Sequence, residues 1–206
     1  VSSDPSNPLE GQIWYNTTTG TLKGVPQLQA WSSSGALATT RYNMGSGVTP
    51  VTAGLVFGGT PGKQTATEEY NGTGWGSGGN LGTGRYILSG FGTQTAGLGA
   101  GGYASPSPGD KALVEEYNGT SWSEVNDLPA ARRGAAGFGT QTAGAIAGGV
   151  PNLNTTLHYD GTNWTSGGNL PVGQDRTEGG GTGTLTAGFL AAGDNRTSFE
   201  YDGSSW

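Results

Sequence analysis

Arginine is the residue type whose spacing in this sequence most directly suggests binding chemistry. One arginine precedes each of four glycine-rich segments: Arg41, Arg85, Arg132 and Arg176. A guanidinium group presents its N–H donors in a planar fork that matches the oxygens of a carboxylate or a sulfate. If the four groups lie together near the mouth of a channel, they can bind an acidic group on a glycan. This is the binding hypothesis for the four arginines.

A second set of ionisable residues offers the arginines partners within the protein. Its members recur in a register of their own: Glu69, Glu116, His158 and Glu200. One Arg–Glu ion pair per repeat, formed between neighbouring repeats, accounts for both sets without a ligand. The sequence leaves this structural interpretation and the binding hypothesis open.

Carboxylates also occur in two adjacent pairs, Glu68-Glu69 and Glu115-Glu116. Glycosidic cleavage needs two carboxyl groups a few ångströms apart across the substrate. Neighbouring residues on a strand point to opposite faces of the sheet, so these pairs do not supply that geometry. The first member of each pair aligns with Leu157 and Phe199 in the other two repeats. We therefore predict no catalytic residues and no enzymatic activity.

The composition argues against several other classes of site. The chain has one histidine, His158, and no cysteine, so we expect neither a metal site of the usual zinc or copper type nor a cofactor. The net charge is −6 and the nine Lys and Arg residues form no run, which argues against nucleic acid as a partner. No apolar stretch approaches the roughly 20 residues that span a bilayer, so we expect no membrane insertion.

The elements that carry these residues repeat along the sequence. Tryptophans at 31, 75, 122, 164 and 206 are 44, 47, 42 and 42 residues apart. A Thr-Ala-Gly marker recurs out of phase with them, at 52–54, 95–97, 142–144 and 186–188. A period of about 40 to 45 residues is typical of a four-stranded propeller blade. The markers predict an all-β propeller with four visible repeats, which form either a small closed ring or part of a larger propeller.

The unit 128–170 shows how one repeat divides into strands. Small residues in RRGAAGFGTQ predict an inner strand, TAGAIAGG a second, and the alternation in TTLHYDG a half-buried third strand before NWTSGGNLP. The phrase EEYNGTSW at 115–122 has equivalents in the other repeats and joins the third and fourth strands. Asn-Gly and Asp-Gly are strong hairpin signals because both residues tolerate positive φ. The Tyr and Trp of the phrase are expected to pack between neighbouring blades.

The repeats resemble the kelch repeat of β-propellers. The resemblance lies in the order of their parts: an arginine, a small-residue strand, Gly-Gly, Tyr, and a Trp six residues before Leu-Pro. The resemblance covers residues 28–206, and the wording GFGTQTAG…GG…EEYNGTSW is similar to kelch-like repeats in virion and tail-fibre proteins of marine and cyanobacterial phages. The segment 7–24 predicts a hairpin and resembles a short element of such fibre proteins. We expect an N-terminal extension over 1–27 and propeller repeats over 28–206, with the segment 28–37 supplying a fourth strand.

The loops between the second and third strands differ most from repeat to repeat. They are 60–66, 103–112, 150–154 and 194–197. Recognition is often found in variable loops on a rigid scaffold, so this face is the expected contact with a partner. Its most prominent residues are Tyr103, Pro106, Pro108, Asp110 and Lys111.

The resemblance implies a non-enzymatic structural protein of a phage virion or tail fibre, located on the virion and outside the cell. We expect its propeller face to bind a host-surface glycan or receptor. The alternative is a purely structural decoration or fibre subunit that contacts only other virion proteins. Assembly as a homo-oligomer stays open.

Overall fold

The computed structural model describes residues 1–6, 12–24, 34–49, 52–105, 109–175, 180–191, 193 and 197–206. All regular elements in these residues are β-strands, joined by turns and loops. The described residues therefore contain no helix long and apolar enough to cross a bilayer. The chain forms two compact units, residues 1–34 and 35–206.

The first unit is built on a β-hairpin. Strands β1 (Ile13–Asn16) and β2 (Thr21–Gly24) pair antiparallel. The Asp4 carboxylate accepts hydrogen bonds from side chains on both strands, among them Lys23. Lys23 and the other donors hold the pKa of Asp4 well below its usual range. The hairpin predicted within 7–24 is confirmed over the described part of that segment.

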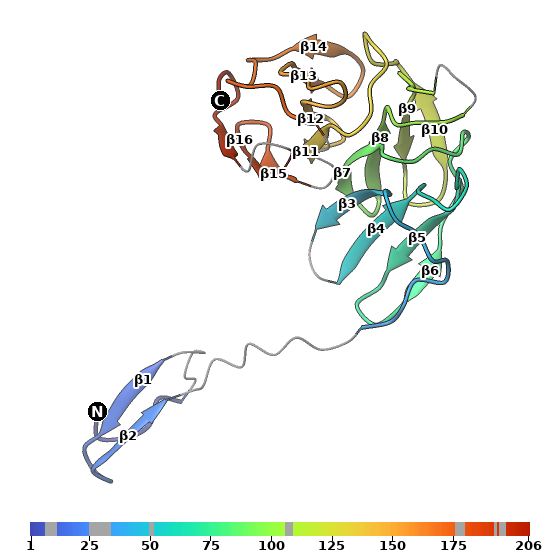
Figure 1. Ribbon diagram of the computed structural model, residues 1–206. Helices are drawn as coiled ribbons and strands as arrows, with labels where there is room; N and C mark the ends of the chain where they lie inside the picture. Colours follow the sequence, from blue (N-terminus) through green and yellow to red (C-terminus); the bar gives the residue numbers. More distant parts are fainter. Residues whose placement is uncertain are drawn as a thin grey trace. The chain divides into compact units, whose positions relative to one another are not determined.

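The second unit consists of four small antiparallel sheets arranged as a β-propeller (Figure 1). Blade 1 contains β3 (Gly45–Thr49), β4 (Ala53–Phe57), β5 (Thr67–Tyr70) and β6 (Trp75–Ser77). Blade 2 contains β7 (Ser89–Thr93), β8 (Ala96–Ala100), β9 (Val114–Tyr117) and β10 (Trp122–Val125). Blade 3 contains β11 (Ala136–Thr140), β12 (Ala143–Ala147), β13 (Thr156–Tyr159) and β14 (Trp164–Ser166). Blade 4 contains β15 (Gly181–Thr184), β16 (Ala187–Ala191) and β17 (Ser198–Tyr201). The predicted all-β propeller with four repeats is confirmed.

The first strand of each blade lies at the centre, where neighbouring inner strands approach closely. β3 packs against β7, β7 against β11, and β11 against β15. A Cβ atom on Gly137 would lie 2.7 Å from the carbonyl oxygen of Gly90, and one on Gly181 would lie 2.6 Å from that of Gly137. Both obstacles are backbone atoms, which cannot rotate away. The prediction that small residues form the inner strands because the centre is crowded is confirmed.

The recurring phrase places its aromatic residues between blades. The ring centroid of Trp122 lies 4.6 Å from that of Phe57 on the preceding blade, and Trp206 lies 5.8 Å from Phe138. The indole N–H of Trp122 also donates to the hydroxyl of Thr67 on blade 1, at 2.9 Å. The indole is therefore fixed to the preceding blade by its ring and by its one polar atom.

The turn within the phrase differs from the predicted hairpin type. Tyr70 pairs with Trp75, so the loop has four residues. Gly72 has a positive φ of 94°, whereas Asn71 does not. The Asn71 side chain accepts hydrogen bonds from the backbone N–H groups two and three residues further on, and Asp160 does the same in blade 3. Asn or Asp suits the first position of this turn because its side chain accepts these backbone hydrogen bonds. Glycine suits the next position because it adopts a positive φ without strain.

Blade 4 has three strands in the described residues, where the other blades have four. The sequence predicts a fourth strand over 28–37, but residues 25–33 lie outside the part of the chain that the structure describes. The expected domain boundary between residues 27 and 28 also falls there.

We predict that Gly137→Ala lowers the free energy of unfolding by about 1–3 kcal/mol, because overpacking against a backbone atom cannot be relieved by a side-chain rotation. Gly76→Ala is the matched control in a blade, since an added Cβ at that position meets no atom within 4 Å. Urea unfolding followed by circular dichroism measures both variants. Equal stability of the two would contradict the close approach of the inner strands.

Candidate functional site

Arg85 lies in the connection from blade 1 to blade 2 and points into blade 2. Its buried side chain donates to the carbonyl oxygens of Gly101 (2.6 Å) and Leu113 (2.7 Å) and to Oε1 of Glu115 (2.9 Å). The backbone N–H of Gly82 donates to the same carboxylate, at 2.7 Å. Burial lowers the pKa of Arg85, and Glu115 opposes that shift. The ion pair holds the connection between blades 1 and 2 against β9, the third strand of blade 2.

The other described arginines of the set are also buried. Arg41 repeats the arrangement in blade 1 with Glu68, at 2.7 Å. In blade 3 the position of the glutamate is held by Leu157, and Arg132 donates to the carbonyl oxygen of Gly148 at 3.4 Å. Burial lowers the pKa of Arg132. None of the three guanidinium groups faces a channel mouth, so each serves the interior of its own blade.

The predicted ion pairs differ from the observed ones in two respects. The observed pairs form within a blade, whereas they were expected between repeats. Their carboxylates are Glu68 and Glu115, one position before the predicted Glu69 and Glu116. The reason is the alternation of side chains along a strand, which turns one glutamate of each pair toward the arginine and the other toward the neighbouring blade.

The fourth predicted arginine, Arg176, lies outside the described residues. In blade 4 the position equivalent to Arg85 and Arg132 is held by Gln174, which is fully buried. The backbone establishes the equivalence, because the carbonyl oxygen of each of these three residues accepts a hydrogen bond from the second glycine of the preceding Gly-Gly pair, at 2.8 Å. The sequence also marks this position. Arg85, Arg132 and Gln174 stand four residues after Leu81, Leu128 and Leu170, respectively.

The second predicted set does connect blades, but its partners are the tyrosines of the phrase. The hydroxyl of Tyr117 donates to Glu69 (2.5 Å), that of Tyr159 donates to Glu116 (2.9 Å), and that of Tyr201 lies 2.7 Å from Nε2 of His158. Burial, and then the hydrogen bond to Glu69, raise the pKa of Tyr117 to about 12. Burial lowers the pKa of His158. Glu200 holds this register on blade 4, where it is exposed.

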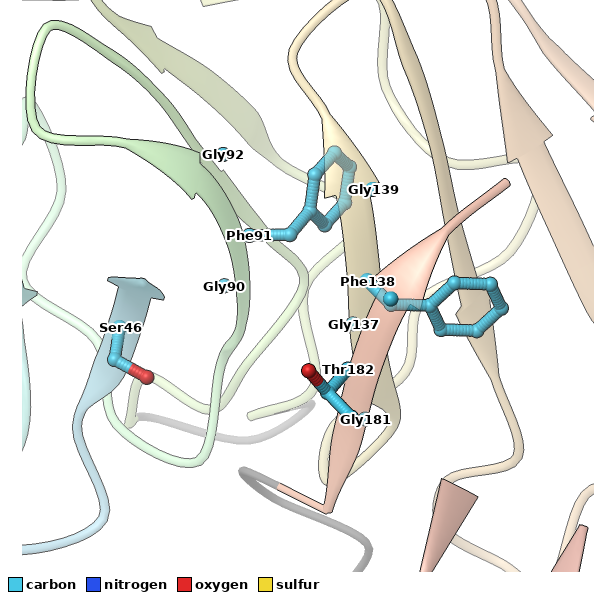
Figure 2. A pocket seen from close by; sticks show the side chains of 10 residues that line it. Ser46, Gly90, Phe91, Gly92, Gly137, Phe138, Gly139, Gly181 and Thr182 are labelled. Atoms are coloured by element: carbon cyan, nitrogen blue, oxygen red, sulfur yellow. The ribbon is translucent and has the colours of Figure 1, made fainter. Parts of the chain in front are cut away.

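The centre of the propeller contains a cavity of about 80 Å³ (Figure 2). Figure 2 shows Ser46 and Thr182 on opposite sides of it, with glycines of the inner strands between them. The volume is enough for two or three water molecules at about 30 Å³ each, and too small for a sugar. No ionisable side chain lines it. In the described residues, no three or more His, Asp or Glu side chains gather in a way that could hold a metal ion.

A larger pocket, of about 380 Å³, lies among the variable loops of blades 1 and 2. It is lined by Lys63, Gly82, Thr83, Gly84, Ala104, Ser105 and Lys111. The Nζ atom of Lys63 donates to the carbonyl oxygen of Ser105, at 2.7 Å, which joins the loops of the two blades. The pocket therefore combines two ammonium groups with hydroxyl groups, and its lining contains no carboxylate.

The predicted loop residues lie in and around this pocket. Lys111 lines it, while Tyr103 and Asp110 belong to the same loop. Arg133 forms an ion pair with Asp110, and its guanidinium carbon lies 5.3 Å from the centroid of the Tyr103 ring. The Tyr86 ring lies 5.2 Å from that of Tyr103. The structure thus brings Tyr103 and Asp110 together through Arg133.

Two residues of this region were missed by sequence reasoning. Lys63 stands in a loop that the repeats mark as variable, but nothing in the sequence shows that it reaches blade 2. Arg133 directly follows the buried Arg132, and only the structure distinguishes the two. The predicted Pro106 and Pro108 lie outside the described residues.

No protein-family model matches this chain, and no curated protein sequence is significantly similar to it. The fold defines the class of protein, a β-propeller of four repeats.

We predict that Arg85→Met lowers the free energy of unfolding by about 3–5 kcal/mol, because it leaves the Glu115 carboxylate buried without its counter-charge. Arg132→Met is the matched control in blade 3. It removes a buried cation that forms no ion pair in the described residues, so we expect a change smaller than about 1 kcal/mol. Urea denaturation measures both, and a larger loss for Arg132→Met would contradict the assigned roles.

The raised pKa of Tyr117 predicts a stability change at high pH. Its contribution is full below the ordinary pKa of 10.0 and is lost as the pH rises through about 12, because the unfolded chain releases the proton first. Tyr117→Phe should therefore lose less stability over this range than the unchanged protein. Tyr15→Phe, in the separate hairpin, serves as control. Parallel stability curves for the protein and Tyr117→Phe, measured by urea unfolding, would show that the hydroxyl is not buried between blades.

Proposed function

We propose that the chain is a non-enzymatic structural protein of a phage virion or tail fibre whose loop face binds an acidic glycan on the host surface. The observation that carries the binding proposal is the pocket shared by blades 1 and 2, whose lining includes Lys63 and Lys111. The chain as a whole carries a net charge of −6, whereas the lining of this pocket contains two lysines and no carboxylate.

The chemistry of the pocket suits a carboxylated or sulfated sugar. Its volume of about 380 Å³ falls in the usual range for small-molecule sites, about 300–1,000 Å³. The two ammonium groups attract the acidic substituent, and the hydroxyl groups of Thr83 and Ser105 suit sugar hydroxyls. Arg41, Arg85 and Arg132 are buried and donate hydrogen bonds inside their own blades. The lysines therefore replace them as the proposed ligand-binding cations.

The distribution of the carboxylates supports a binding role without catalysis. Glu68 and Glu115 pair with arginines, and Glu69 and Glu116 accept hydrogen bonds from tyrosines. The loop pocket has no carboxylate in its lining. A pair of carboxyl groups facing a bound sugar, as glycosidic cleavage requires, is therefore missing from this site.

The proposed location rests on the resemblance of the repeats to those of phage fibre proteins. It implies other virion proteins as partners and an extracellular position on the virion, with residues 1–27 as a fibre-like element before the propeller. The purely structural alternative shares this location and differs only in lacking a glycan ligand.

We predict that the protein binds carboxylated or sulfated glycans on an array and does not bind their neutral counterparts. Charge reversal in the variant Lys63→Glu/Lys111→Glu should weaken binding at least about tenfold, which corresponds to about 1.4 kcal/mol. Lys23→Glu, in the hairpin, is the charge-matched control and should bind normally. Absence of binding to every acidic glycan by the intact protein would favour the structural alternative.

A further inference from the structure

The contact between blades 3 and 4 differs from the contacts between the preceding blades in the residue that accepts the tyrosine hydroxyl. Glu69 accepts it between blades 1 and 2, and Glu116 accepts it between blades 2 and 3. His158 holds this place between blades 3 and 4, with its Nε2 atom 2.7 Å from the hydroxyl of Tyr201. It is the single histidine of the sequence. A group that titrates near neutral pH therefore stands where the other contacts use a carboxylate.

The hydrogen bonds of Tyr201 assign the neutral form to this imidazole. The backbone N–H of Gly168 donates to the Tyr201 hydroxyl at 3.3 Å, as that of Gly79 donates to the Tyr117 hydroxyl at 3.2 Å. The hydroxyl oxygen is thus the acceptor for a backbone group, which leaves the hydroxyl hydrogen for Nε2. Because Nε2 accepts this hydrogen bond, His158 carries its own proton on Nδ1.

The Nε2 side of the imidazole is closely packed, although His158 as a whole is half-buried. A Cβ atom added to Gly167 would lie 2.4 Å from Nε2 of His158 and 2.9 Å from the Tyr201 hydroxyl oxygen. The two rings meet edge to face, with centroids 5.6 Å apart. This packing leaves little room for a water molecule at Nε2, and burial lowers the pKa of His158.

The strands and turns around His158 bring it no ion-pair partner in the part of the chain that the structure describes. Its neighbours across the sheet are Ala145 on β12 and Thr165 on β14, and β14, β15 and β16 contain no charged residue. The charged residues on β17 and in the adjoining turns are Asp160, Glu200 and Asp202. The two aspartates accept backbone N–H groups of their own turns, and the glutamate lies on the face of β17 opposite Tyr201. Burial is therefore the influence that acts on the imidazole.

This contact also lacks a polar interaction that the preceding ones have. The side chains of Gln94 and Gln141 each donate to two carbonyl oxygens of the preceding blade, at 2.9–3.2 Å. Leu185 stands at the equivalent place in blade 4, where GTLTAG replaces GTQTAG. A leucine side chain donates no hydrogen bond. The bond between Tyr201 and His158 is therefore a larger part of the polar contact here than at the other two interfaces.

We propose that His158 makes the contact between blades 3 and 4 sensitive to acid, so that blade 4 loosens from blade 3 when the imidazole is protonated. Protonation at Nε2 turns the acceptor of the Tyr201 hydroxyl into a second donor, and the hydroxyl hydrogen loses its partner at the interface. The indole of Trp206 still donates to Thr156 at 2.9 Å and packs against Phe138. Blade 4 therefore stays attached to blade 3 and opens locally.

The direction of the pH dependence follows from the neutral form that the interface favours. Below the ordinary pKa of 6.5, the unfolded chain takes up the proton before the folded protein does. The contribution of His158 to stability is full above this value and is lost as the pH falls through the lowered pKa of the folded state. Over that interval the equilibrium constant for opening rises by up to about tenfold per pH unit. Glutamate carboxyl groups ordinarily titrate lower, at about 4.3.

The first test combines a proton NMR titration of the single histidine with urea unfolding between about pH 7.5 and 5.5. We expect the ring signal of His158 to titrate below 6.5 in the folded protein, and stability to fall over this range. His158→Gln is the matched control, because its amide offers the Tyr201 hydroxyl an acceptor that does not titrate, so its stability should stay constant. An equal loss in His158→Gln, or a ring signal that titrates at or above 6.5, would overturn the proposal.

The second test locates the opening by hydrogen exchange, corrected at each pH for the exchange rate of unstructured peptides. Amides of β16 and β17 should open more often as the pH falls from about 7.5 to 5.5, while those of β8 and β9 keep their protection. In Tyr201→Phe the ring signal of His158 should titrate closer to 6.5, because the bond to the neutral imidazole is gone. Tyr117→Phe alters the equivalent tyrosine of blade 2 and should leave that titration unchanged. Acid opening spread evenly over all blades would contradict the assignment to His158.

Discussion

Close contact between neighbouring sheets is the constraint on which the rest of this structure depends. At the centre, the carbonyl oxygen of Gly90 occupies the space in which any side chain on residue 137 would have to fit. Because the inner strands approach so closely, the sheets must diverge outward, and large residues must fill the wedge between them. Trp122 fills it between blades 1 and 2, and Trp206 between blades 3 and 4. The glycines allow the inner strands to approach closely, and the aromatic residues of the phrase fill the space between the diverging sheets.

This constraint also decides where binding chemistry can occur. Several charged residues in the blades form internal contacts: Arg85 pairs with Glu115, and Glu69 accepts a hydrogen bond from Tyr117. The central cavity is too small for a sugar and lacks ionisable groups. The loops between second and third strands carry no share of the contact at the centre, so their length and sequence can vary. A charged pocket such as that of Lys63 and Lys111 can form there without disturbing the blades.

Most of the fold could be predicted from the sequence because the sequence repeats. The features that could not be predicted are those that spacing and residue type do not determine. Period, inner strands and the aromatic phrase all follow from spacing and residue size. The partner of Arg85 was placed one residue too late, because adjacent glutamates look alike in sequence and differ only in the face they occupy. The sequence analysis assigned Arg176 to the fourth equivalent position because it searched for an arginine. The position is held by Gln174, which stands four residues after Leu170, as Arg132 stands four residues after Leu128. Contacts between loops, such as that of Lys63 with Ser105, need the spatial order of the blades.

The four blades together form a natural substitution series at one buried position. Blades 1 and 2 pair arginine with glutamate, blade 3 combines Arg132 with Leu157, and blade 4 combines Gln174 with Phe199. Blade 3 has the same four strands as blades 1 and 2, so a blade forms without the ion pair. This agrees with the general finding that a buried ion pair gains little over apolar residues, because desolvation offsets the attraction. Arg85, Arg132 and Gln174 all retain one backbone contact, because the carbonyl oxygen of each accepts a hydrogen bond from the preceding blade. The side chain can therefore change while the contact between blades persists.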